Sequence, residues 1–347
     1  MNFSSDNVAG VSPEILAALA AANAGRQPSY GVDPITARVE TRLAEIFEHE
    51  VAVFPVATGT AANALALATV LPPWGVVYCH AEAHILVDEC GAPEFYAGGA
   101  RVLGLAAPHG KISPADLAPL LPGGKGVVHH MQPAAISLTQ ASEAGTVYRP
   151  DEIAAIAELA RAHQLPLHVD GARFANALVH LDCAPADITW RAGVDILSFG
   201  ATKNGAAAAE AVIFFDAAKA AGFAFRRKRG GHLFSKMRFL SAQLDAYLAD
   251  DLWLRNARRA NAAAKRLAEG LARIPGLRLR HAVEANEIFV EMPDALIEAL
   301  FARGFHFYRW DGPQGNCVRL VTAFDTDISD VDAFLATARG VNNVEER

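Results

Sequence analysis

The chain has 347 residues, 52% of them hydrophobic and 20% charged, so it can bury a large core and form a two-domain globular protein. Its formal net charge of -7 argues against a nucleic-acid partner or an anionic membrane surface, because both favour an excess of Lys and Arg. The amino terminus lacks a signal-peptide pattern, no stretch of about 18 uninterrupted apolar residues occurs, and the four cysteines form no C-x-x-C pair, so we expect a cytoplasmic protein with no membrane span.

Helix and strand patterns alternate through the first half of the chain. Ser12 fits the N-cap and Pro13 the first position of an alanine-rich helix. Apolar residues at helical spacing predict a second helix over 35–47. The following patterns predict strands at 51–56, 76–79, 101–105 and 127–130, helices at 61–71, 113–120 and 150–163, and a loop at 137–148. Strands and helices that alternate over short connections predict a mostly parallel sheet.

The turn Ala57-Thr58-Gly59-Thr60 connects the predicted strand at 51–56 to the helix at 61–71. The first backbone N–H groups of a helix have no intrahelical partner and the helix dipole favours an anion, so this turn is suited to hold a phosphate group. The threonine hydroxyls could act as further donors. The alternative interpretation is an ordinary N-cap with no ligand.

Two histidines follow the strand at 76–79, in the segment His80-Ala81-Glu82-Ala83-His84. Because residues four apart share a helix face, a metal site made by His80, His84 and Asp88 is one interpretation. The interpretation that we prefer is a histidine lying flat against the ring of an aromatic ligand. We therefore expect no metal site.

Two buried strand patterns, each followed by a charged residue, lie in the middle of the chain. The apolar run at 167–169 stops at Asp170, and a similar run at 194–199 is followed by Lys203. Side chains at the carboxyl ends of parallel strands converge on one crevice, so we expect these two to meet there. Together they suit pyridoxal 5'-phosphate (PLP), in which a lysine forms a Schiff base and an acid keeps the pyridine nitrogen protonated. The alternative is a solvated Asp and an unrelated surface Lys.

The chain changes character after the second of these strands. The sequence predicts a buried strand at 211–215, then a basic loop at 225–232, then a long helical pattern at 233–273 that divides into two helices. The remainder alternates short strand and helix patterns, with strands at 287–292, 305–310 and 317–322 and helices at 293–303 and 329–339. We therefore predict an N-terminal arm and large α/β domain over 1–245 and a smaller α+β domain over 246–347.

Several segments, taken in order, resemble those of a known family. They are FSSDNVAGVSPEIL, YGVDP, ATGTAAN, AHILVDECGAPE, HVDGARFANA, SFGATKNG and RLVTAFDTD. Over nearly its whole length the chain is similar to the PLP-dependent threonine aldolases of the β-eliminating lyase group, above all the bacterial low-specificity type that also cleaves phenylserine. The resemblance implies a fold type I, aspartate aminotransferase-like architecture. It also implies a homotetramer, built as a dimer of dimers, with active sites between subunits.

The same resemblance implies which residues hold the cofactor. Lys203 would be the Schiff-base lysine, Asp170 the partner of the pyridine nitrogen, and His84 the imidazole stacked on the ring. Further cofactor contacts would come from Thr58, Gly59 and Thr60, from Arg173, and, across the dimer interface, from Lys228 and Arg229 of the basic loop.

The substrate carboxylate would be held by Ser5, Arg173 and Arg319, and Tyr30 would reach in from a neighbouring subunit. An arginine can offer a carboxylate two parallel hydrogen bonds, which fixes the rotation about the Cα–N bond and hence the bond that breaks. For Arg173 the alternative is an arginine at a helix start that pairs with Asp170 or with the cofactor phosphate. For Ser5 it is a capping or solvated serine.

From these residues we expect a lyase that splits L-threonine, L-allo-threonine or phenylserine into glycine and an aldehyde. The base that takes the hydroxyl proton is either His84 or a water that it holds with a neighbour. Other members of the family carry a histidine in the loop at 139–142, and here Ser142 takes its place. Two alternatives stay open. One is another PLP enzyme that performs β-elimination, transamination or hydroxymethyl transfer on a small amino acid, and the other is an α/β protein that binds a phosphorylated metabolite without covalent chemistry.

Overall fold

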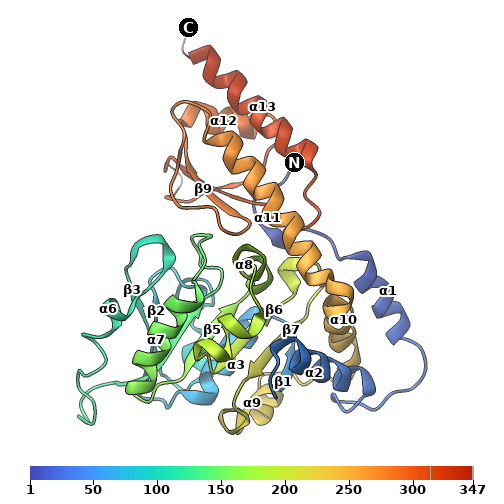
Figure 1. Ribbon diagram of the computed structural model, residues 1–347, viewed down its shortest axis with the longest axis vertical. Helices are drawn as coiled ribbons and strands as arrows, with labels where there is room; N and C mark the ends of the chain where they lie inside the picture. Colours follow the sequence, from blue (N-terminus) through green and yellow to red (C-terminus); the bar gives the residue numbers. More distant parts are fainter. Residues whose placement is uncertain (313, 346–347) are drawn as a thin grey trace.

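The structure is a computed structural model and describes residues 1–312 and 314–345 (Figure 1). Within these residues it has a seven-stranded sheet with the order β1-β7-β6-β5-β4-β2-β3 and a four-stranded sheet with the order β10-β11-β9-β8. The long helix α11 (Leu252–Leu271) runs from the large part of the molecule to the small one, and both chain ends lie near the small part (Figure 1). The α/β class expected from the sequence is confirmed.

The large sheet is built from strands that follow the apolar runs of the sequence. They are β1 (Ala52–Val56), β2 (Gly75–His80), β3 (Arg101–Leu105), β4 (Gln132–Thr139), β5 (Leu167–Gly171), β6 (Ile196–Gly200) and β7 (Glu210–Phe214). Neighbouring strands from β3 through β2, β4 and β5 to β6 pair in parallel, whereas β7 is antiparallel to both β6 and β1. Every residue of β5, β6 and β7 is buried, as expected for strands covered on both faces.

Helices surround this sheet, and their starts follow local sequence signals. They are α1 (Pro13–Ala22), α2 (Pro34–Phe47), α3 (Gly59–Val70), α4 (His84–Val87), α5 (Ala92–Tyr96), α6 (Pro114–Leu117), α7 (Pro150–Ala162), α8 (Phe174–Leu181), α9 (Phe223–Arg229) and α10 (Arg238–Leu248). Asp33, for example, caps α2 by accepting hydrogen bonds from the N–H groups of Ile35 and Thr36. None of the helices in the described ranges is long and apolar enough to cross a membrane.

The strand predicted at 127–130 is wrong, because these residues form turns. Val128 is 92% exposed, and Gly124 and Gly126 beside it adopt positive φ angles that interrupt an extended chain. The strand is instead β4, which begins at Gln132 and includes residues 137–139 of the predicted loop. Pro133 near its start disguised it, since proline is uncommon inside strands.

Residues 225–229 of the basic segment predicted as a loop belong to the short helix α9. Its buried residues Phe223 and Arg227 are four apart and so lie on one helix face. The Arg227 guanidinium lies 5.3 Å from the ring centre of Phe54, and burial lowers the pKa of this arginine to about 10. The four consecutive basic residues at 226–229 made the buried face of this helix unrecognisable in the sequence.

The smaller part of the molecule consists of the small sheet and the helices that pack against it, together with the first residues of the chain. Its elements are β8 (Arg278–Leu279), β9 (Glu287–Glu291), α12 (Asp294–Ala302), β10 (Tyr308–Arg309), β11 (Cys317–Val321) and α13 (Ile328–Glu345). Phe3 belongs to its hydrophobic core, and the backbone of Phe3 bonds to His306 and Val321. The N-terminal arm therefore packs on the small sheet before the chain enters the large one.

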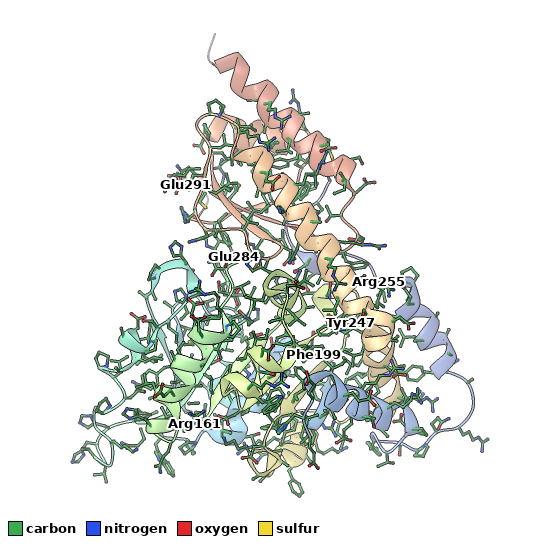
Figure 2. The ribbon with its side chains drawn as sticks, in the orientation of Figure 1. Arg161, Phe199, Tyr247, Arg255, Glu284 and Glu291 are labelled. Carbon is green, nitrogen blue, oxygen red and sulfur yellow. The ribbon has the colours of Figure 1, made fainter. Side chains whose placement is uncertain are left out.

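Aromatic rings fill the region where α10 and α11 meet the large sheet. The ring centroid of Phe199 on β6 lies 6.1 Å from that of Tyr247, and both residues are labelled in Figure 2. It lies 5.7 Å from the ring centroid of Trp253. The side-chain amide of Asn204 donates to the Tyr247 hydroxyl at 2.7 Å and to the Trp253 carbonyl at 2.8 Å. The core thus fixes the turn that carries Lys203, the residue before Asn204.

His168 is fully buried in β5, two residues before Asp170 and on the same face of the strand. Its Nδ1 lies 2.9 Å from the Ser137 hydroxyl and its Nε2 lies 2.9 Å from the Ser198 hydroxyl. Burial lowers the pKa of the imidazole to about 4. The side chain is therefore neutral at ordinary pH and connects β4, β5 and β6.

This burial predicts a specific loss of stability in acid. Between pH 6.5 and 4 the unfolded chain binds a proton at His168 and the folded chain does not, so the free energy of unfolding falls by about 3 kcal/mol as the pH decreases through this window. His168→Gln removes the titrating group, so the difference in unfolding free energy between wild type and variant should shrink by that amount between pH 7 and pH 4. Chemical denaturation at several pH values measures it, and a difference independent of pH would contradict the assignment.

Candidate active site

A cavity of about 330 Å³ opens at the carboxyl ends of β5 and β6. Asp170 and Ser198 are register partners on these strands, and both line the cavity. Lys203 follows the end of β6 at Gly200 and lines it too. The two side chains that the sequence predicted to converge therefore share one cavity.

The carboxylate of Asp170 is held by hydrogen bonds from two directions. Its Oδ1 accepts from the backbone N–H of Ala172 at 3.0 Å, and its Oδ2 accepts from Nδ2 of Asn63 at 2.7 Å. Nδ2 of Asn63 also donates to Oε1 of Glu89 at 2.8 Å, and this oxygen lies 2.9 Å from Nδ1 of His84. A continuous chain of contacts therefore links His84 to Asp170 through buried groups.

His84 lines the same cavity with part of its imidazole exposed. The hydrogen bond to Glu89 raises the pKa of His84, burial opposes this effect, and Asp170 and Glu143 add to it. Glu89 is itself buried, and burial raises the pKa of its carboxyl while His84 and Asn63 lower it. The pair thus favours a proton on Nδ1 of His84, facing Glu89.

The amino end of α3 forms a third wall. Thr58 is the N-cap, and its hydroxyl accepts from the N–H of Ala61 at 3.1 Å. Thr58, Gly59 and Thr60 all line the cavity. Because the first N–H groups of a helix lack intrahelical partners, this wall presents backbone donors to an anion.

Glu210, at the start of β7, faces the cavity beside Lys203. Its Oε2 accepts from the N–H of Ala201 at 2.8 Å. Burial raises the pKa of this carboxyl to about 7, although nearby donors and Lys203 pull it down. The floor of the cavity therefore holds an acid that titrates near neutrality.

Arg173 lies behind the cavity and does not line it. Its Nε and Nη2 donate to the two carboxylate oxygens of Asp6 at 2.8 and 3.0 Å, and its Nη1 lies 3.0 Å from Glu287. Burial disfavours the cation, but the two carboxylates hold the pKa of Arg173 above its ordinary value. The structure therefore pairs Arg173 with Asp6 and Glu287 and not with Asp170, the first partner considered for it from the sequence.

Arg319 and Ser5 lie near Arg173, also outside the cavity lining. Nη2 of Arg319 donates to the carbonyl of Ser4 at 3.2 Å, and its guanidinium lies 4.8 Å from the ring centre of Trp310. Its buried Nε has no hydrogen-bond partner within the described residues. The hydroxyl of Ser5 accepts from the N–H of Asn7 and caps a short helical turn, the alternative considered for this serine.

Tyr30, Lys228 and Arg229 lie away from this cavity. Tyr30 is 48% exposed, and Nζ of Lys228 lies 4.9 Å from the centre of its ring. Arg229 lines a different hollow together with Phe95. The structure therefore groups Tyr30 with Lys228 on an exposed surface and does not bring them to their own chain's cavity.

The metal site considered for His80, His84 and Asp88 has no support in the geometry. Nε2 of His80 lies 2.9 Å from the carbonyl of Ala107, and its Nδ1 accepts from the N–H of Glu82 at 3.1 Å. His84 is bound to Glu89. Among the residues that the structure describes, no group of three or more His, Cys, Asp or Glu side chains is arranged to hold a metal ion.

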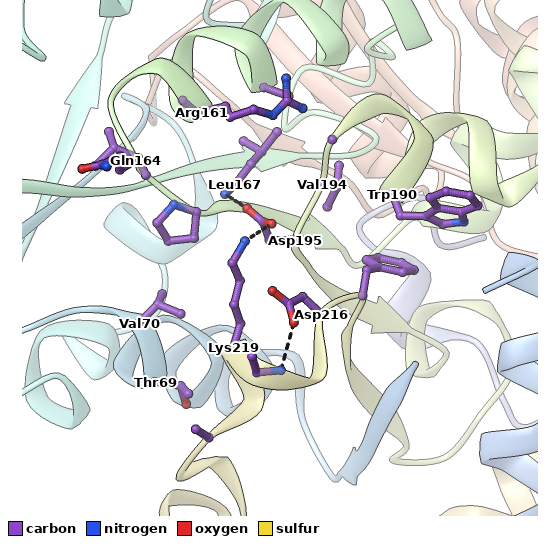
Figure 3. A pocket seen from close by; sticks show the side chains of 18 of the residues that line it. Thr69, Val70, Arg161, Gln164, Leu167, Trp190, Val194, Asp195, Asp216 and Lys219 are labelled. Atoms are coloured by element: carbon purple, nitrogen blue, oxygen red, sulfur yellow. Dashed lines mark hydrogen bonds and ion pairs between the residues drawn. The ribbon is translucent and has the colours of Figure 1, made fainter. Parts of the chain in front are cut away.

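A larger cavity of about 810 Å³ lies at the opposite, amino ends of β5 and β6 (Figure 3). Asp195 in its wall accepts from the N–H of Leu167 at 2.8 Å and pairs with Lys219. Asp195 and Lys219 thus neutralise each other's charge. None of the site residues predicted from the sequence lines this cavity, so we place the active site at the carboxyl ends of the strands.

Sequence reasoning missed four acidic or amide side chains of the site, namely Asn63, Glu89, Glu143 and Glu210. Asn63 ends the segment ATGTAAN, and Glu89 lies in the segment AHILVDECGAPE, so both stood inside segments that carried the family resemblance. Glu210 leads a buried strand, and an acid in an otherwise apolar run is a usable signal. In the loop after β4, Ser142 turns inward to Thr146 at 2.7 Å, and its neighbour Glu143 lines the cavity.

Comparisons with known proteins show the family to which the chain belongs. The family model for β-eliminating lyases matches residues 2–295. The chain belongs to the β-eliminating lyase family. It is 46% identical to a low specificity L-threonine aldolase of Pseudomonas aeruginosa over 329 residues, 95% of this chain and 94% of that one. It is 42% identical to another from a Pseudomonas species, over 98% of this chain and 97% of that one.

A solved structure of Leishmania major threonine aldolase superposes on this chain with a TM-score of 0.92. The two are 28% identical, and the match covers 98% of this chain and 99% of the other. These findings confirm the fold type I architecture and identify the protein as a PLP-dependent lyase.

The residues of the cavity fit PLP. An amine at Lys203, a fixed carboxylate at Asp170 and an imidazole at His84 stand around one space, and the donor-rich end of α3 closes one side of it. The cavity volume of about 330 Å³ lies within the range of small-ligand sites. The donor set therefore matches a cofactor with a phosphate, an aldehyde and a ring nitrogen.

The buried contact between Asp6 and Arg173 predicts a large effect on stability. Asp6→Ala leaves part of a buried guanidinium without its partner, so the free energy of unfolding should fall by about 3 kcal/mol. Asp332→Ala is the matched control because it removes a bidentate but exposed partner of Arg266, and it should cost less than about 1 kcal/mol. Urea denaturation at one fixed protein concentration measures both, and equal losses would contradict the buried clamp.

Proposed function

We propose that this protein is an aldolase that uses PLP to cleave β-hydroxy-α-amino acids into glycine and an aldehyde, with L-threonine, L-allo-threonine and phenylserine as substrates. The observation that carries the proposal is one cavity lined by Lys203, Asp170 and His84, in a chain 46% identical to an enzyme named low specificity L-threonine aldolase.

The cofactor contacts follow from the walls of the cavity. Lys203 would hold the cofactor through Nζ, Asp170 would be the partner of its ring nitrogen, and His84 would lie against its ring. Thr58, Gly59 and Thr60 would hold its phosphate. When bound, the cofactor supplies a ring that withdraws the electron pair released at the substrate Cα.

The remaining residues position the substrate. Arg319 is the stronger candidate for the substrate carboxylate, because its buried Nε lacks a partner within the described residues whereas Arg173 is engaged by two acids. Arg173 then acts mainly by holding Asp6, whose neighbour Asn7 lines the cavity. Ser5 adds a hydroxyl beside this arm. Fixing the carboxylate orients the Cα–Cβ bond for cleavage.

Other reactions of a PLP enzyme give different products, which makes the assignment testable. With L-threonine, an aldolase releases glycine and acetaldehyde without ammonia and without folate. β-Elimination releases ammonia, transamination needs an oxo-acid acceptor, and hydroxymethyl transfer needs folate. A panel of threonine, allo-threonine and phenylserine isomers therefore identifies the reaction and the preferred side chain together.

Lys203→Ala is expected to abolish cofactor attachment and aldehyde release together, with a loss of at least about 10³-fold in kcat. Lys219→Ala is the matched control, since that lysine lines the other cavity and pairs with Asp195. The visible absorption spectrum of the reconstituted protein and an aldehyde assay with L-threonine measure the two effects. A Lys203→Ala protein with an unchanged spectrum would support noncovalent binding of a phosphorylated metabolite.

The proposal also covers how the subunits assemble and where in the cell the protein works. We propose a cytoplasmic homotetramer, a dimer of dimers, in which Tyr30, Lys228 and Arg229 of one subunit serve the active site of its neighbour. The exposed pairing of Tyr30 with Lys228 supports this arrangement, and four cysteines without disulfides suit a reducing compartment. We also propose the domain boundary near residue 245.

A shared active site predicts complementation between subunits. Lys203→Ala and Tyr30→Ala proteins, each impaired alone, should regain aldehyde release when unfolded together and refolded, because a hybrid contains one site with both residues intact. Lys203→Ala mixed with Asp170→Ala is the control, since both lesions lie in the same chain's cavity and no hybrid site escapes. Equal behaviour of the two mixtures would rule out the contribution of Tyr30 across the interface.

A further inference from the structure

Glu143 is a cavity residue to which the proposed mechanism gives no task. It lies in the loop between β4 and α7 and lines the cavity together with His84, Asp170 and Lys203. Its side chain is only partly exposed. An acid in this position costs free energy through desolvation, which calls for a functional reason.

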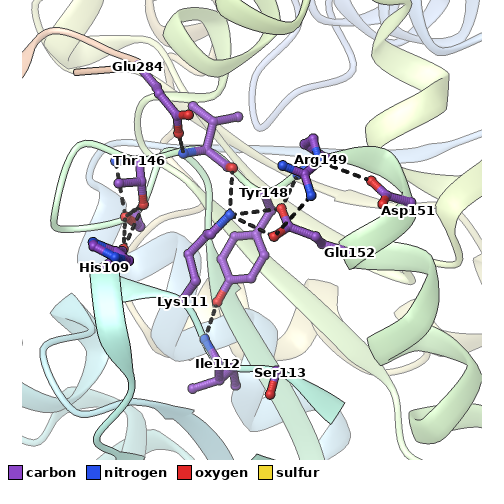
Figure 4. A network of polar contacts seen from close by, with 12 residues as sticks. His109, Lys111, Ile112, Ser113, Thr146, Tyr148, Arg149, Asp151, Glu152 and Glu284 are labelled. Carbon is purple, nitrogen blue, oxygen red and sulfur yellow. Dashed lines mark hydrogen bonds and ion pairs between the residues drawn. The ribbon is translucent and has the colours of Figure 1, made fainter. Parts of the chain in front are cut away.

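The loop that carries Glu143 is anchored on both sides (Figure 4). The hydroxyl of Thr146 donates to the carbonyl of His109 at 2.7 Å, and the N–H of Val147 donates to Glu284 at 2.7 Å. On the other side of Glu143, the side chain of Gln140 exchanges hydrogen bonds with the backbone of Tyr148 at 2.8 and 2.9 Å. Glu143 is therefore presented to the cavity by a fixed segment.

The carboxylate itself is uncommitted. Within the part of the chain that the structure describes, it makes no hydrogen bond and no ion pair. Burial raises the pKa of Glu143, and Lys203 and Arg173 partly offset this. The charged groups that face it are Lys203, Arg173, Asp170, His84 and Glu287. A carboxyl with these properties can exchange a proton with a ligand in the cavity.

His84 is poorly suited to accept a proton. Its Nδ1 is bound to Glu89, and the hydrogen bond that Glu89 makes raises the pKa of the imidazole. Nδ1 is therefore committed to the contact with Glu89 and is not available to take a proton from a ligand in the cavity. The bond to Glu89 suits His84 better for orientation over a ring than for taking a proton.

We propose that Glu143 is the general base that takes the proton of the substrate's β-hydroxyl group, an inference that rests on the aldolase function proposed above. The O–H bond breaks, and its proton goes to a carboxylate oxygen of Glu143. The electron pair left on the oxygen forms the second C–O bond of the aldehyde, while the Cα–Cβ bond breaks. Its electron pair stays with the glycine fragment, whose Cα then takes one proton, so the proton count closes without another reactant.

The test compares Glu143→Gln with wild type and with Glu82→Gln, an exposed control outside the active cavity. Glu143→Gln should lower kcat for aldehyde release from L-threonine about 100-fold or more, the range of general base catalysis. Exchange of the glycine α-hydrogen with solvent deuterium should stay within about twofold, because that reaction involves no β-hydroxyl. The visible spectrum of the reconstituted variant should match wild type, and Glu82→Gln should behave as wild type throughout.

A pH profile separates a base from a purely structural carboxylate. Because Glu143 must be ionised to accept a proton, kcat/KM of wild type should fall as the pH decreases through its raised pKa. Glu143→Gln should lack this decrease at low pH. Glu143→Asp should recover part of the wild-type rate and should still show the decrease at low pH.

Each outcome distinguishes the inference from the function on which it rests. If wild type releases no aldehyde from any substrate, the proposed aldolase function fails. If wild type is active and Glu143→Gln is equally active, the inference fails and the function stands. If the variant loses glycine exchange in parallel with aldehyde release, or its spectrum changes, Glu143 supports the cavity and is not the base.

Discussion

The fixed position of the Asp170 carboxylate is the constraint on which the rest of the site depends. Asp170 is the residue before the last of β5, its carbonyl accepts from the N–H of Gln140 at 2.8 Å, and Asn63 and the backbone of Ala172 hold its two carboxylate oxygens. A charged group buried at a strand end is stable only with such partners. Neutral His168, two residues earlier, adds no competing charge beneath it. The acid is therefore rigid before any ligand binds, which is what preorganised electrostatic catalysis requires.

A second buried cluster ties three distant parts of the chain together. Asp6 comes from the N-terminal arm, Arg173 from the turn after β5, and Glu287 from β9 of the small sheet. Asn286 donates to Asp6 at 3.0 Å and to the carbonyl of Thr322 at 2.7 Å, which extends the cluster across the small sheet. The arm that brings Asn7 to the cavity is thus anchored by charge pairing as well as by Phe3 in the small core.

The elements that position the site could be predicted where one local signal dominates. The apolar runs of β5 and β6 are continuous and the cap of α3 is local, so the convergence of Asp170 with Lys203 and the turn at 58–60 could be predicted from the sequence, and the family resemblance joined them into one site. Strand β4 and helix α9 were missed because proline and clustered arginines masked their periodicity. Asn63 could not be recognised as a partner of Asp170, since the two are 107 residues apart and only the fold brings them to 2.7 Å. The engagement of Arg173 by Asp6 and Glu287, and the direction of Glu143, likewise depend on tertiary contacts that no local pattern encodes.

The most direct test of this account is a crystal structure of the protein reconstituted with PLP. The account predicts electron density continuous from Nζ of Lys203 to the cofactor, with the ring nitrogen within hydrogen-bond distance of a carboxylate oxygen of Asp170 and the phosphate at the amino end of α3. A cofactor bound to another lysine, or a ring nitrogen that faces away from Asp170, would contradict it.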